Sequence, residues 1–288
     1  MNVYLLFAIM YAITLSSTVL AKKFQLGVKL TASFLFQANF INAIIACVCL
    51  FVANKFVVNT TPATLVYSAI FGFFSLISLF FIVYSYSRLP LTLCSIIGSA
   101  GAIIIPMIFG LVFNGEPAGT RLIISAVLIL VASVLPVFKD KTIKFDKKFL
   151  WFLVIYFIYS GLPTILSKLY TQAENVADTL SYFFLTNAFM FVFCGIGLVV
   201  CRIKDGYMSI LSTPLIVNGG IRTVMSLICS YLSMVILTVM PVSVYSVLSA
   251  SLSLIGTALL SRFVFKEKIS RQALISFILA LLSIIIRG

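Results

Sequence analysis

The sequence predicts an all-α membrane protein in which ten transmembrane helices form two inverted five-helix repeats. Apolar residues make up 62% of the chain and charged residues only 9%, whereas about 25% of a soluble domain is charged. Polar interruptions divide the chain into ten apolar runs of roughly 20 residues, the length that crosses about 30 Å of hydrocarbon. The pattern of the first five runs also recurs in the last five.

The apolar runs are predicted to be helices because backbone groups in lipid must satisfy their own hydrogen bonds. The first run has no basic leader, so we do not expect it to be a cleaved signal. The expected spans are residues 2–21, 31–53, 64–87, 90–113, 119–138, 149–169, 177–200, 211–238, 241–264 and 271–287.

The internal repeat is read from residues that recur at a constant shift. Pro90 and Pro241 lie 151 positions apart, and the same shift places Glu116 on Glu267. Five spans are an odd number, so the second copy must enter the bilayer upside down. Inverted repeats of this kind are typical of alternating-access transporters, with the substrate near the midplane.

Three segments follow from this repeat. Residues 1–139 form the first repeat, residues 140–148 form a basic linker, and residues 149–288 form the second, inverted repeat. The other connections are short, so we expect no large domain outside the membrane.

The net charge of +13 is interpreted as a topology signal and not as affinity for nucleic acid. Fifteen Lys and Arg residues fall in the connections on one face and four on the other. Basic residues remain cytoplasmic, so both termini are predicted to lie outside.

The composition also argues against several kinds of chemistry. The chain has no histidine and no Cys-x-x-Cys, so a metal site or histidine-based catalysis lacks its residues. There is no Gly-x-x-x-x-Gly-Lys-Ser/Thr loop for ATP. We therefore expect no enzyme activity, catalytic residue, metal or cofactor.

The seven acidic residues all fall in loops or at span ends. Proton-coupled cation exporters commonly use a carboxylate buried in the membrane. Its absence from the predicted spans favours a neutral, zwitterionic or anionic substrate.

Arg222 is the strongest single candidate for substrate binding because it is a charge inside the eighth span. A guanidinium can hold a carboxylate or phosphate through two hydrogen bonds. Alternatively, it reaches an interface or pairs with backbone carbonyls. The equivalent position of the first half is Phe71, so such a site would be asymmetric.

Other polar side chains within the spans are candidates to line the same site. Asparagines at matching depths either bond a neighbouring helix or face the substrate. Tyrosines either belong to the interfacial belt or offer a ring and a hydroxyl to a pocket. These substrate-binding candidates are Tyr11, Asn39, Tyr84, Tyr159, Asn187, Tyr231 and Tyr245.

The matched residues of the two halves are interpreted as gating or structural. An acidic residue at the start of the last span of each half suits the dipole of that helix. A lysine that closes the first span of each half either snorkels to the surface or gates the cavity. These residues are Lys22, Lys168, Glu116, Glu267, Pro90 and Pro241.

Together with the internal Pro106, the order and spacing of these residues resemble the drug/metabolite transporter superfamily. The likeness is to its ten-span, EamA-like bacterial metabolite exporter branch. The resemblance implies a multi-pass carrier in the bacterial cytoplasmic membrane, often an exporter of amino acids or other metabolites. It also implies a central cavity lined by spans one, three, four, six, eight and nine.

The leading hypothesis is a secondary transporter for a small polar metabolite, an amino acid or a related carboxylate. Its partners would be that substrate and membrane lipid, with a coupling proton or ion left open, and the chain would act as a monomer or homodimer. Three alternatives remain: an efflux carrier for organic cations or drugs, a flippase or membrane enzyme for lipid-linked substrates, and a non-transporting structural partner.

Overall fold

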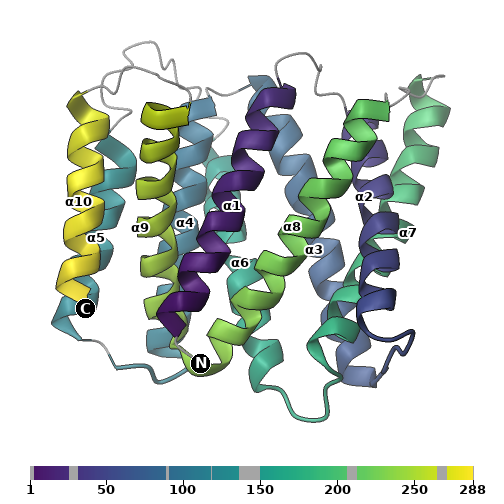
Figure 1. Ribbon diagram of the computed structural model, residues 1–288, viewed down its shortest axis with the longest axis horizontal. Helices are drawn as coiled ribbons and strands as arrows, with labels where there is room; N and C mark the ends of the chain where they lie inside the picture. The colour runs from purple at the N-terminus through teal and green to yellow at the C-terminus, as the bar shows by residue number, and fades with distance from the viewer. Residues whose placement is uncertain are drawn as a thin grey trace. The chain divides into compact units, whose positions relative to one another are not determined.

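The computed structural model describes residues 3–25, 32–88, 91–117, 119–135, 150–205, 213–264 and 271–287. These residues form helices and no strand (Figure 1). The elements are α1 (Val3–Gln25), α2 (Ala32–Ala53), α3 (Pro62–Arg88), α4 (Leu91–Val112), α5 (Thr120–Val134), α6 (Leu150–Gln172), α7 (Thr179–Asp205), α8 (Thr213–Val239), α9 (Val242–Leu259), the π-helical η3 (Leu260–Val264) and α10 (Arg271–Arg287).

The all-helical prediction is confirmed for the described residues, and a helix occupies each of the ten predicted positions. Four of these helices, α1, α2, α7 and α8, are long and apolar enough to cross a membrane. Shorter apolar stretches of 10–17 residues lie in α3, α4, α5, α9 and α10. Ten complete crossings and their orientation remain predictions, and both chain ends and the linker at 140–148 lie outside the described residues.

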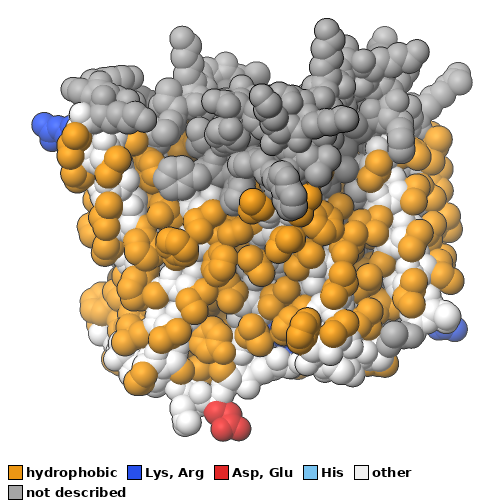
Figure 2. Space-filling view, turned by 180° about the vertical axis from the view of Figure 1, so that it is seen from behind, with side chains coloured by type: hydrophobic (Ala, Val, Ile, Leu, Met, Phe, Trp, Pro, Cys, Tyr) orange, Lys and Arg blue, Asp and Glu red, His pale blue; other side chains and the backbone are white. Residues whose placement is uncertain are grey.

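The surface of the described helices suits lipid. Large apolar side chains are exposed on many of them, including Val48, Val192 and Ile285. Figure 2 shows apolar side chains over most of the described part of one face. Apolar surface on this scale is unfavourable in water and marks a contact with lipid or another protein.

The chain divides into two compact units that cut across the sequence halves. Unit 1 contains residues 1–84 and 169–235, and therefore α1, α2, α7 and most of α3 and α8. Unit 2 contains residues 85–168 and 236–288, and therefore α4, α5, α9, α10 and most of α6. Each unit thus combines helices from both proposed repeats.

Within each unit, helices at matching positions of the two halves pack against each other: α2 with α7, α4 with α9 and α5 with α10. The α2 and α7 pair is antiparallel, because Asn59, just after α2, donates to Asp178, just before α7. In the α5 and α10 pair, Ser283 near the end of α10 donates 2.9 Å to the carbonyl of Ser125 near the start of α5. The antiparallel direction of these two pairs is compatible with an inverted repeat, which itself stays a prediction.

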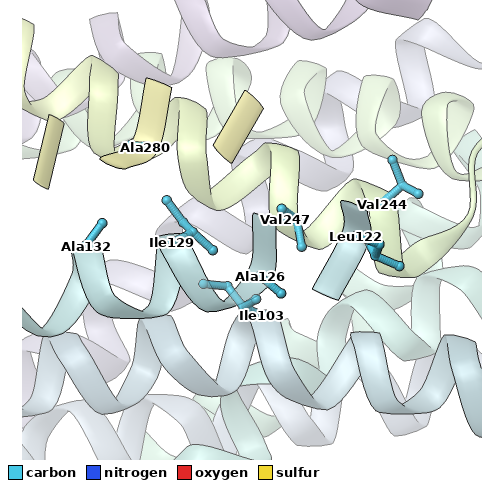
Figure 3. Packing of buried hydrophobic residues seen from close by; sticks show 8 residues of the cluster. All are labelled: Ile103, Leu122, Ala126, Ile129, Ala132, Val244, Val247 and Ala280. Carbon is cyan, nitrogen blue, oxygen red and sulfur yellow. The ribbon is translucent and has the colours of Figure 1, made fainter. Parts of the chain in front are cut away.

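The two units have different cores. In unit 2, α5 packs with α4, α9 and α10 through small and branched aliphatic side chains around Ile103, Ile129 and Val247, each fully buried (Figure 3). In unit 1 the core is aromatic, with the rings of Tyr170 and Tyr182 stacked 4.0 Å apart.

Candidate functional site

A contact between α1 and α8 in unit 1 fixes which faces of these helices meet. The Cys229 thiol lies 3.4 Å from the Thr14 hydroxyl and donates to the Met10 carbonyl at 3.5 Å. The same carbonyl accepts the Thr14 hydroxyl at 2.8 Å. The stripe of α8 that contains Cys229 therefore faces α1.

Arg222 lies on this stripe. It precedes Cys229 by seven residues, or about two helical turns and 10 Å along the axis. A seven-residue step returns to nearly the same side of a helix, so Arg222 is on the α1-facing side of α8. Its side chain is exposed, and none of the described residues forms a hydrogen bond or ion pair with it.

Asn218 is one turn before Arg222 on the same stripe and has a different environment. Its side chain is only 5% exposed, and neither amide atom has a hydrogen-bond partner within the described structure. An unpaired polar group in an apolar environment costs about 1–3 kcal/mol. Of the buried side chains that lack a partner among the described residues, Asn218 is the one with two unpaired polar atoms.

The hydroxyls of α1 add acceptors to this region. Thr14 and Thr18 both donate to carbonyls one turn earlier in α1, at 2.8 and 2.9 Å. Each hydroxyl keeps its lone pairs free to accept another bond. Cys229 and Thr14 form the described contact between the two helices. By helical spacing Thr18, Asn218 and Arg222 lie on the same sides of α1 and α8, and we call these two sides the α1–α8 seam.

The predicted asparagines in α2 and α7 behave alike. Asn39 donates to the carbonyl of Leu35, and Asn187 to that of Phe183, both at 2.8 Å. Each amide thus uses one donor within its own helix. The structure does not show either amide bonding a neighbouring helix.

The predicted tyrosines are not gathered into one place. Tyr11 on α1 stacks on Phe7 at a centroid distance of 6.3 Å. Tyr231 is exposed and follows Arg222 by nine residues, which places it on the opposite side of α8. Tyr159 and Tyr245 are both buried and belong to unit 2, while the side chain of Tyr84 lies outside the described residues.

Lys168 does not reach the surface, so the snorkelling interpretation of this residue is wrong. Its side chain is 7% exposed. Its ammonium donates to the carbonyls of Leu237 and Met240, at 2.7 and 3.1 Å, where α8 ends. The last carbonyls of a helix have no partner within it, so the lysine satisfies them and complements the negative end of the dipole.

Glu116 also has a different role from the one expected, because it caps α9 and not its own helix α5. Its carboxylate accepts the backbone N–H groups of Val242 and Ser243, at 2.7 and 2.9 Å, and the Ser243 hydroxyl. These N–H groups are the unpaired donors of the first turn of α9. The N-cap of α5 is Gly119, which has no side-chain cap.

The environment of Glu116 keeps its carboxylate ionised. Partial burial opposes ionisation and on its own would raise its pKa. Hydrogen bonds from Ser243, Val242 and Asn114 outweigh the burial, so the pKa lies below its ordinary value.

Lys168 and Glu116 thus hold the same turn of unit 2, which we call the α8–α9 junction (residues 236–243). Pro241 lies in that turn, and its carbonyl accepts the N–H of Tyr245 at 3.0 Å. Of the residues that match Pro241, Glu116 and Lys168 in the other half of the chain, Pro90 and Glu267 lie outside the described residues, as does the side chain of Lys22.

Sequence reasoning missed Asn218, Thr14 and the capping role of Glu116. The spacing of four between Asn218 and Arg222 was a usable signal for the first. The roles of Thr14 and Glu116 depend on which helices pack together, which the sequence does not show. Among the described residues, no group of three acidic, cysteine or histidine side chains could hold a metal.

Comparisons with known proteins inform the fold alone. No protein-family model matches the chain, and no curated protein sequence matches it. Solved structures do match. One of them has a TM-score of 0.74 and 14% sequence identity, and the alignment covers 96% of this chain and 93% of the other.

Proposed function

We propose that the protein is a secondary transporter that moves a small polar metabolite, an amino acid or a related carboxylate, across the cytoplasmic membrane by alternating access. The observation that carries the proposal is the position of Arg222, on the α1-facing stripe of an apolar membrane helix and without a described ionic partner. Two threonines and a buried asparagine share that seam.

The cost of this arginine supports a functional role. An arginine at the centre of a membrane helix costs about 2.5–3.5 kcal/mol on insertion scales. Arg222 lies in the first third of the apolar stretch Ile216–Val239, so its cost is below that figure. No described carboxylate offsets that cost. A guanidinium binds a carboxylate through two parallel hydrogen bonds, so a bound anion would offset the cost when the substrate is present.

The acidic residues support an anionic or zwitterionic substrate over a cation. Among the described residues, Glu116, Glu174 and Asp178 lie in connections, and Asp205 ends α7. A cation exporter would need a carboxylate within the membrane helices.

The compact units suggest which bodies move. Each unit has its own core, so the moving bodies would be the two units and not the two sequence halves. Antiparallel pairing of matching helices supports the inverted repeat on which such motion is built. The driving force would be an ion or solute gradient, in line with the resemblance to the drug/metabolite transporter superfamily.

Uptake into proteoliposomes tests the proposal. Radiolabelled amino acids and small carboxylates are offered to vesicles that contain wild type, Arg222→Ala or Arg202→Ala. Arg202 is an exposed residue near the end of α7 and serves as the matched control. We expect Arg222→Ala to lose uptake and Arg202→Ala to retain it. Equal uptake of every carboxylate by wild type and Arg222→Ala would refute the role of Arg222.

A further inference from the structure

Asn218 differs from Asn39 and Asn187, the two asparagines at matching positions of α2 and α7. Asn39 and Asn187 each place an amide hydrogen on a carbonyl of their own helix. Asn218 is more deeply buried, and both its carbonyl oxygen and its amino group lack a partner.

Asn218 lies on the same face of α8 as Arg222, the residue proposed to bind the substrate's carboxylate. Residues four apart on a helix have side chains about 5–6 Å apart on one face. Asn218 and Arg222 are four apart, on the side of α8 that faces α1 through Cys229. A small ligand held by the guanidinium would therefore have the amide within reach of its next polar group.

We propose that Asn218 is a binding residue for a second polar group of the substrate, adjacent to the carboxylate held by Arg222. The substrate class is then a carboxylate that also bears an amino, hydroxyl or amide group, and simple aliphatic acids are excluded. An asparagine amide offers one acceptor and two donors, so any of these groups can pair with it. This inference rests on the proposed function and narrows it.

The specificity follows from the cost of leaving the amide unpaired. A site that hydrogen-bonds a polar group rejects an analogue without that group, because the protein group then stays buried and unsatisfied. Removing the amide should abolish this discrimination and leave the binding of the carboxylate itself.

Ligand-induced thermal stabilisation of the purified full-length protein provides the test, because a ligand that binds only the folded state raises Tm. The probes are L-alanine and L-lactate, each compared with propionate, and succinamate compared with levulinate. Each pair shares its carboxylate and differs in one polar group. The proteins are wild type, Asn218→Ala, Arg222→Ala and the control Asn59→Ala, which removes an exposed amide from the connection after α2.

We expect wild type to bind at least one polar probe about tenfold more tightly than its partner, and Asn59→Ala to keep that ratio. Asn218→Ala should bind both members of the pair equally. The inference would be overturned if Asn218→Ala kept the affinity ratio between the two probes of a pair while Arg222→Ala bound neither probe. That result would leave the proposed function intact. If no carboxylate stabilises wild type, the inference and the anion-binding role of Arg222 both fail.

A second readout does not depend on the choice of probe. Without ligand, Asn218→Leu should keep or raise Tm, because it removes an unsatisfied polar group and keeps a similar volume. Asn39→Leu should lower Tm, because it removes a hydrogen bond. An equal loss of Tm in both variants would show that Asn218 is structural and would overturn the inference.

Discussion

The carboxylate of Glu116 caps the first turn of α9 through Ser243, which offers it both its backbone N–H and its hydroxyl. Glu116 follows α4 in the chain, and Ser243 lies 127 residues later. The cap therefore joins the end of one helix to the start of its antiparallel neighbour in unit 2. Lys168 holds the other side of the same α8–α9 junction.

Substitution of Glu116 should destabilise the protein. In wild type, the N–H groups of Val242 and Ser243 each bond a different carboxylate oxygen of Glu116. Glu116→Gln removes the charge and leaves only one acceptor oxygen for these two N–H groups. Losing a charge-assisted hydrogen bond costs about 1.5–3 kcal/mol. Thermal unfolding in detergent measures the effect, with Glu174→Gln, on an exposed connection, as the control. Equal Tm values for the two variants would refute the cap.

The same residue predicts a dependence of stability on pH. The folded pKa of Glu116 lies below its ordinary value of 4.5, so its stabilising contribution is complete above that value and is lost as the pH falls through the folded pKa. Asp178 shifts in the same direction, so wild type must be compared with Glu116→Gln. The Tm difference should be constant near neutral pH and shrink below about pH 4.5. A difference that grows on acidification would contradict the assignment.

Lys168 and Glu116 should act together because both hold the α8–α9 junction. Lys168→Met leaves the carbonyls of Leu237 and Met240 without their donor, at a cost of about 1–3 kcal/mol. Once the hydrogen bonds of one residue are lost and its side of the junction loosens, the hydrogen bonds of the other residue contribute less to stability. The double variant Glu116→Gln/Lys168→Met should therefore lose less stability than the sum of the single losses, by about 0.5–3 kcal/mol. Strict additivity would show that the two residues are independent.

Close helix packing in unit 2 predicts a glycine that cannot be replaced. A Cβ at Gly101 would overlap the backbone of Phe157 and the hydroxyl of Ser160, both in α6. Gly101→Ala should therefore greatly reduce the yield of folded protein. Gly119→Ala is the matched control, because a Cβ there meets nothing within 4 Å. Normal yield and Tm for Gly101→Ala would show that α4 and α6 are not so close.

The helix positions could be predicted from the sequence because long apolar runs leave the backbone no alternative in lipid. Predicted and observed bounds agree closely, for example 31–53 against Ala32–Ala53 and 241–264 against Val242–Leu259 followed by η3. The helix bounds could be predicted because each depends on the residues of a single apolar run.

The partners of individual side chains could not be predicted in the same way. Glu116 and Val242 are 126 residues apart, and only the packing of α4 on α9 brings them together. For Lys168 the sequence left two interpretations open, snorkelling to the surface and gating the cavity. The carbonyl of Leu237 that it satisfies is 69 residues away in the chain, so the sequence does not reveal this contact. Arg222 was found from its charge alone, whereas the direction it faces depends on the contact of Cys229 with α1.

Solute counterflow in sealed proteoliposomes without ATP tests the central claim most directly. Vesicles are preloaded with unlabelled amino acids and small carboxylates, and a trace of each labelled compound is added outside. The account predicts transient accumulation of at least one label with wild type and none with Arg222→Ala at equal amounts of folded protein. Label entry no faster than in protein-free vesicles, with wild type shown to be folded, would contradict it.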